Sequence, residues 1–147
     1  MKTLWFLALP ALAAASGCVP DHPPAPEEVA IDRHDMGEKL FAEGHYQEAA
    51  VEFEYDVQTR PRWKAPYLQL AACHEKLHHD NDAIAVLERL LRIDSTDDEA
   101  LKCLGRLYAV RGDSAHALVY VRKLKALHPE DPSLDGEIAR LEAMRKP

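Results

Sequence analysis

The sequence is poor in residues that favour β-sheet. Ala and Leu far outnumber Val, Ile and Thr, and aromatic residues make up 7% of the 147 positions. Branched and aromatic side chains suit a pleated surface, so their scarcity argues against a β-sandwich or a β-barrel. Basic residues are also in the minority, with 18 Lys and Arg against 25 Asp and Glu and a formal charge of -7. A chain of this charge lacks the basic surface that nucleic-acid binding requires.

The motifs of common enzyme chemistries are missing too. The three cysteines form no Cys-x-x-Cys pair, and there is no Gly-rich phosphate loop and no serine nucleophile elbow. One exception is His74-Glu75-x-x-His78, which has the HExxH spacing of zinc peptidases. No third zinc ligand is evident for it, so a zinc metallopeptidase is kept only as an alternative.

We therefore predict a protein that is not an enzyme, with no catalytic residue, no cofactor and no metal site. A looser alternative stays open, in which a metal is held near the same motif by a group of imidazoles and carboxylates. Its members are His74, His78, His79, Asp80 and Asp82.

One long apolar run is present, from Leu4 to Ala15, preceded by Lys2. It is too short to cross a bilayer of about 30 Å and is typical of a secretory signal. The run ends in Ala15-Ser16-Gly17-Cys18, which resembles the lipobox of bacterial lipoprotein signal peptides. The resemblance implies that residues 1–17 are a signal peptide and that Cys18 carries acyl chains as a membrane anchor. A cut after Ala15 by the ordinary signal peptidase is the alternative.

The segment that follows, 18–29, is rich in proline. Prolines favour an extended polyproline II spacer, although a flexible tail without a positional role is an equal alternative. Together with the lipobox, this tether predicts a protein exported to a bacterial cell envelope and anchored by lipid, with the outer membrane facing the periplasm as the expected location.

The rest of the chain repeats with a period of 34 residues. Each unit has the apolar spacing of two amphipathic helices, and Gly44 and Gly112 lie at equivalent turns between them. Small residues are expected where the paired helices approach closely. Six sets of positions share the register: Met36, Leu70, Leu104; Gly37, Ala71, Gly105; Leu40, His74, Tyr108; Ala49, Ala83, Ala117; Phe53, Leu87, Val121; and Pro61, Ser95, Pro129.

This pattern resembles the tetratricopeptide repeat family, most closely at Gly44-His45-Tyr46 and Leu104-Gly105. The resemblance implies an all-α, right-handed superhelical solenoid. Asp56 departs from the pattern, because the family usually has Ala there, and Ser95 replaces a closing Pro. The implied domain covers 30–147, with repeats at 30–63, 64–97 and 98–131 and a capping helix at 132–146.

Members of this family bind an extended or helical segment of another protein in a concave groove lined by the first helix of each repeat. We expect apolar anchors of the partner near Phe41 and Leu68. Its acidic groups are expected near Lys102, Arg106 and Arg140. A solvated helix face without a ligand stays open. The groove residues implied by the resemblance are His34, Glu38, Phe41, Leu68, Ala72, Glu75, Lys102, Arg106 and Arg140.

The carboxylate clamp of chaperone-binding members is not reproduced, which disfavours chaperone C-termini as partners. Its places hold His34, Glu38, Gln69, Glu99 and Cys103. The remaining cysteine, Cys73, lies one repeat before Cys103, so the two form either a disulfide or two buried thiols.

The function predicted from these features is a membrane-anchored adaptor or scaffold that mediates protein-protein interaction in the envelope. Assembly of a pilus, a secretion system or an outer-membrane machine is the expected setting. A homotypic structural spacer is a further alternative, and homo-oligomerisation stays open.

Overall fold

The computed structural model describes residues 26–145, with side chains from residue 33 onward, and within this range every regular element is a helix. The predicted all-α fold is therefore confirmed. The seven helices of this range are α1 Pro26–Ala42, α2 Tyr46–Thr59, α3 Ala65–Lys76, α4 Asp80–Ile93, α5 Asp98–Val110, α6 Ser114–Leu127 and α7 Pro132–Arg145.

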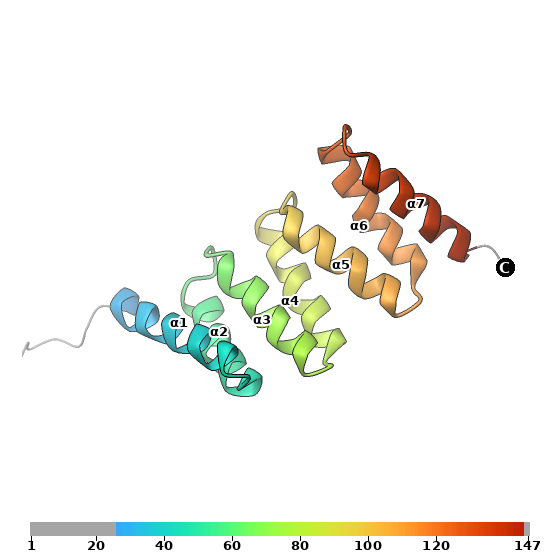
Figure 1. The fold of residues 1–147 in the computed structure, drawn as a ribbon. Coiled ribbons are helices and arrows are strands. Elements are labelled where there is room, and N and C mark those ends of the chain that lie inside the picture. The colour runs from blue at the N-terminus through green and yellow to red at the C-terminus, as the bar shows by residue number, and fades with distance from the viewer. Residues whose placement is uncertain (1–25, 146–147) are drawn as a thin grey trace, which may run out of the picture.

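Each helix packs mainly against the next one along the chain. Figure 1 shows the consequence: α1, α3, α5 and α7 form one layer, and α2, α4 and α6 lie behind them in a second layer. Three helical hairpins thus stack side by side, and α7 covers the open side of α6. This is the predicted solenoid of three repeats with a capping helix.

One set of alanines is fully buried in all three hairpins, as the repeat predicts: Ala49, Ala83 and Ala117. Two small residues of the first helices, Gly37 and Gly105, lie close to the second helices, and a Cβ added to Gly105 would be 3.9 Å from the carbonyl oxygen of Ala117. A Cβ atom added to Gly37 would lie 2.8 Å from the ring of Phe53, and one added to Gly105 would lie 2.9 Å from Val121 Cγ2. The glycines make room for these larger side chains of the second helices.

The turns inside the hairpins also follow the repeat. Gly44 and Gly112 have φ angles of 86° and 77°, the left-handed region that glycine enters without a steric cost. The equivalent residue of the second hairpin is His78, which has a φ of 58° and is the one non-glycine residue with positive φ in residues 26–145.

The N-terminal boundary differs from the prediction, because α1 begins at Pro26 rather than at residue 30. Proline is well tolerated in the first turn of a helix, where its missing N–H has no partner to lose. The signal peptide 1–17, the lipidated Cys18 and the first part of the 18–29 tether lie outside the described residues. None of the helices in residues 26–145 has the length and apolarity that a bilayer span needs.

The departure at Asp56 is accommodated by a polar cluster inside the first hairpin. Asp56 is fully buried, and its carboxylate lies 3.0 Å from His34 Nδ1 and accepts a hydrogen bond of 3.2 Å from Arg60. The Trp63 ring closes this cluster, with the guanidinium carbon of Arg60 3.7 Å above it and the His34 ring 4.2 Å away. The buried charge is therefore surrounded by partners.

Candidate protein-binding surface

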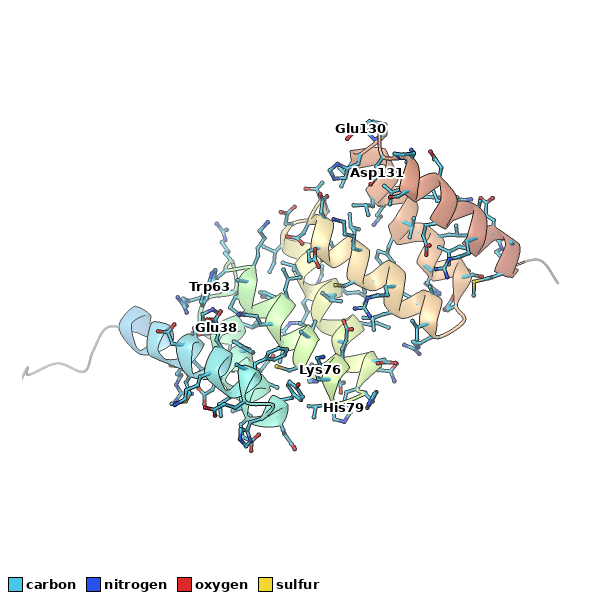
Figure 2. All side chains as sticks on the ribbon, viewed as in Figure 1. Glu38, Trp63, Lys76, His79, Glu130 and Asp131 are labelled. Atoms are coloured by element: carbon cyan, nitrogen blue, oxygen red, sulfur yellow. The ribbon has the colours of Figure 1, made fainter. Side chains whose placement is uncertain are left out.

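A hollow of about 380 Å³ opens on the layer of first helices, between α1 and α3. The fully buried Phe53 of α2 contributes to its lining below these helices. Gln69 donates a hydrogen bond of 2.8 Å to Glu38 across the hollow, and Figure 2 shows Glu38 on α1. The lining is mostly apolar and consists of Glu38, Phe41, Phe53, Leu68, Gln69 and Ala72.

A second hollow, of about 290 Å³, lies between α5 and α7. Apolar side chains of α6 and α7 line its interior, and three cationic side chains surround them. The lining residues are Lys102, Gly105, Arg106, Ala109, Val110, Val121, Leu124, Leu134, Glu137 and Arg140. The predicted apolar and basic ends of the groove therefore correspond to two separate hollows.

The basic end is partly neutralised by acids. Arg106 donates two hydrogen bonds, of 2.8 and 2.6 Å, to the carboxylate of Glu75, and these bonds raise the pKa of the guanidinium. Arg140 is bound in the same way to Glu137, at 3.0 Å through Nε. Among residues 33–145, Lys102 is the one predicted groove cation without an ion pair. It therefore carries the charge that is free to meet a partner.

His34 does not lie in either hollow, which corrects its predicted place in the groove. Only 13% of its side chain is exposed, because Asp56 and Trp63 hold it between α1 and the link to α3. Its other ring nitrogen lies 3.5 Å from Glu38. His34 thus lies beside the first hollow and contacts Glu38, one of the residues that line it.

Sequence reasoning missed two residues of the second helices that line the hollows. Phe53 lines the first hollow and Val121 lines the second. The signal was present in the two glycines opposite them, since Gly37 and Gly105 carry no side chain that would cover the second helix. Ala71 occupies the equivalent position of the middle repeat. The hollows thus occur at the two repeats that have glycine at this position.

The HExxH residues do not form the helical pair that a zinc peptidase needs. Helix α3 ends at Lys76, and His78 lies beyond it in the turn with a positive φ. The carboxylate of Glu75, which would activate a zinc-bound water, is bound to Arg106 instead. The two imidazoles therefore do not share one helix face.

Cys73 and Cys103 are free thiols in the structure, so the disulfide left open by the sequence is not formed there. Cys73 is fully buried, and this burial raises the pKa of its thiol to about 11. Cys103 is half-buried, with its sulfur 3.9 Å from a carboxylate oxygen of Glu99. Both behave as small apolar residues at the boundary of the second and third repeats.

Comparison with known proteins agrees with this geometry. The sequence model described as Tetratricopeptide repeat matches residues 40–107. The peroxisomal targeting signal receptor of Komagataella phaffii is 30% identical over 115 residues, covering 71% of this chain and 20% of the receptor. Peroxisome biogenesis protein 5 of Arabidopsis thaliana is 31% identical over 94 residues, covering 64% of this chain and 13% of that protein. The chain spans a fifth or less of these relatives.

Solved structures resemble the fold along most of its length. The second TPR domain of human RPAP3, in complex with an HSP70 peptide, has a TM-score of 0.68 at 18% identity and covers 80% of this chain and 98% of that one. PcrH, in complex with the chaperone binding region of PopD, has a TM-score of 0.64 at 18% identity and covers 82% and 91%. With its 34-residue period, paired helices and capping helix, the chain belongs to the tetratricopeptide repeat family.

Proposed function

We propose that this protein is a non-enzymatic adaptor that binds a segment of another protein across α1, α3, α5 and α7. The observation that carries the proposal is the apolar hollow over Phe53, which opens on the layer of first helices next to the half-buried Phe41 and Leu68. An apolar side chain of a partner would bury its surface there and gain about 25 cal/mol per Å² removed from water.

The charges along the surface indicate how the partner segment is oriented. Glu38 lies at the first hollow, and the unpaired Lys102 lies at the second. A segment with an apolar anchor in the first hollow and an acidic group near Lys102 would match both. Because Arg106 and Arg140 are already bound to acids, we assign them a smaller share of the attraction than Lys102.

Structural neighbours support this mode of action. The human RPAP3 domain is in complex with an HSP70 peptide, and the Yersinia enterocolitica type III secretion chaperone SycD, a match over 80% of this chain with a TM-score of 0.65, is in complex with a peptide of the translocator YopD. For this chain we favour a partner other than a chaperone C-terminus, since the positions of the carboxylate clamp hold acids, His34, Gln69 and Cys103.

We further propose that the adaptor acts in a bacterial cell envelope, held by lipid on Cys18 at the outer membrane and facing the periplasm. The lipobox-like Ala15-Ser16-Gly17-Cys18 supports this location. Assembly of a pilus, a secretion system or an outer-membrane machine is the setting we favour. Replacement of Cys18 by Ala should move the protein from the membrane fraction to the soluble fraction. Retention of that variant in the membrane would contradict the lipid anchor.

The partner can be identified by crosslinking from a photoreactive residue at Ala72, within the apolar hollow, compared with one at Val119, which is half exposed on α6. A protein captured only from Ala72 is then purified and its affinity measured. Leu68→Asp should weaken binding at least tenfold, while the control Val119→Asp leaves it unchanged. Equal binding by both variants, or capture of the chain itself with concentration-dependent self-association, would replace the adaptor by the spacer alternative.

A further inference from the structure

Three polar side chains converge at the turn between α3 and α4. His74 comes from the last turn of α3, His79 precedes α4, and Asp82 lies in its first turn. One ligand atom of each lies within 4.8 Å of those of the other two. Figure 2 shows His79 at this end of the second hairpin.

These side chains converge without bonding one another. His79 makes no capping hydrogen bond with its side chain, and the buried Nδ1 of His74 has no hydrogen-bond partner. Within residues 33–145, no hydrogen bond or ion pair joins the two imidazoles to Asp82. A buried ring nitrogen without a partner is costly, so the hydrogen-bonding capacity of His74 is not satisfied by the residues around it.

In the third repeat, the side chains at two of the equivalent positions pair with each other. Asp113 and His116 are equivalent to His79 and Asp82, with acid and base exchanged. Asp113 caps α6 by accepting from the backbone N–H of His116 at 3.1 Å, and its other oxygen lies 2.7 Å from His116 Nδ1. The His116 ring stacks on Tyr108, the equivalent of His74, at 5.0 Å. The second repeat has the same backbone and lacks this closed network.

The backbone of the turn holds the converging side chains in place. The N–H of His79 donates a hydrogen bond of 2.8 Å to the carbonyl of His74, and the N–H of His78 bonds to Glu75 at 3.0 Å. The turn is therefore fixed on both sides of the cluster, and only side-chain rotations are needed to bring the three ligand atoms closer together.

We propose that His74, His79 and Asp82 form a binding site for a zinc ion. Two imidazole nitrogens and one carboxylate oxygen are ligands that Zn²⁺ accepts, whereas Mg²⁺ and Ca²⁺ prefer oxygen alone. With ligand bonds of about 2.0–2.2 Å, neighbouring ligand atoms of a tetrahedral zinc are about 3.4 Å apart. The exposed side chains of His79 and Asp82 can make up the difference by rotating.

The surroundings are compatible with a cation. The hollow beside the turn contains the carboxylates of Asp80 and Asp82 against the one cationic side chain of Arg111. His74 is half-buried, whereas the other two side chains of the cluster are exposed to solvent. The site differs from the HExxH expectation, because it uses His79 in place of His78 and involves no role for Glu75.

Such an ion would join the end of α3 to the start of α4. With three protein ligands, a tetrahedral zinc would take its fourth ligand from water. None of the three proposed ligands lines either hollow of the proposed protein-binding surface. The site is therefore independent of the adaptor function, and we expect it to stabilise the second repeat through binding to the folded state.

The test is calorimetric titration of the full chain, prepared without a histidine tag and freed of metal, with zinc chloride. We expect one site per chain that calcium and magnesium do not occupy. Asp82→Asn and His79→Ala should each weaken binding by about tenfold or more. Asp82 is exposed, so its replacement leaves the fold intact and keeps the test independent of the half-buried His74.

Matched controls are available in the neighbouring repeats. His45→Ala alters the residue equivalent to His79 in the first repeat, and His116→Ala alters the residue equivalent to Asp82 in the third. Both should leave the affinity within twofold, as should His78→Gly. Absence of zinc binding, or binding that is equally strong in the cluster variants and the controls, would overturn the proposal. Loss of binding in His78→Gly alone would favour the HExxH pair instead.

Discussion

The first and second repeats differ at one fully buried position, which holds a charged residue in the first and an apolar residue in the second. Asp56 in α2 and Leu90 in α4 occupy equivalent positions, and both are fully buried. Asp56 is surrounded by His34 and Arg60, whereas Leu90 belongs to the continuous apolar core. The equivalents of His34 and Arg60 in the second repeat are Leu68 and Asp94, so no base is present there. A helical repeat thus fixes where a residue lies, while its neighbours decide whether a charge is tolerated.

The third repeat is intermediate between these two. Its buried residue at this position is Leu124, but Lys102 and His128 stand where the first repeat has His34 and Arg60. His128 is bound to Asp98 at 2.6 Å, and Lys102 is exposed at the second hollow. The third repeat therefore has bases at these two positions but an apolar residue at the buried one. It serves as a control for the comparison of the first two repeats.

The largest effect is expected from Leu90→Asp. This variant buries a carboxylate where the equivalents of His34 and Arg60 are not bases, and we expect it to lower the free energy of unfolding by about 4 kcal/mol or more, enough to unfold many domains. Leu124→Asp should cost less, because Lys102 and His128 occupy these two positions in the third repeat. Urea unfolding followed by circular dichroism measures both. Equal losses in the two variants would show that the neighbouring bases do not matter.

A smaller loss is expected from His34→Leu, which leaves Asp56 with Arg60 alone. We expect about 2–4 kcal/mol, since breaking a buried pair leaves a charge without compensation. The double variant His34→Leu/Asp56→Leu copies the residues of the second repeat and should recover most of the loss.

The double-mutant cycle for these two positions measures their coupling from the same unfolding curves. A coupling below about 0.5 kcal/mol would mean that the histidine contributes packing against Phe53 and Trp63 rather than charge compensation.

The fold could be predicted because its signal is periodic. Recurring small and apolar residues fix the helix pairs, and the turn glycines Gly44 and Gly112 fix their ends. The start of α1 at Pro26 was missed because that segment precedes the first complete repeat. Its proline content is equally typical of a spacer and of a helix start.

The candidate surface was only partly predictable. A position in the repeat shows which helix face a residue occupies, and Phe41, Leu68 and Ala72, which the repeat places on the groove side of the first helices, line one hollow. It does not show which long side chains pair across repeats. The bond from Arg106 to Glu75 joins adjacent repeats, and it depends on side-chain reach rather than on period. The contacts of His34 likewise follow from Asp56, a residue that departs from the pattern of the repeat.

Filling the space left by glycine should give effects of about 1–3 kcal/mol. Gly37→Ala forces a methyl group against the Phe53 ring at 2.8 Å, and overpacking of this kind is destabilising. Gly136→Ala in α7 is the matched control, because nothing lies within 4 Å of its added Cβ. That variant should gain about 0.5–1 kcal/mol from helix propensity. Thermal melts of the two variants should therefore shift in opposite directions.

If Gly37→Ala leaves the stability unchanged, the Phe53 ring can change its position at little cost in free energy. The part of the first hollow that Phe53 lines would then be mobile. The same variant then provides a second readout, since a displaced ring would change the affinity for the partner captured at Ala72.

The smallest effect concerns the hairpin turns, where His78 has the backbone conformation of Gly44 and Gly112. A non-glycine residue is strained there, so His78→Gly should raise the free energy of unfolding by about 0.5–1 kcal/mol, less than the full steric cost because glycine also loses more chain entropy. Gly44→Ala should lower it by about 1 kcal/mol. Both are measured with a chelator present, so that zinc at the neighbouring cluster does not contribute. If His78→Gly destabilises the protein instead, the imidazole makes a contact worth more than the strain of the turn, and the second repeat would differ from its neighbours in its turn as well as in its core.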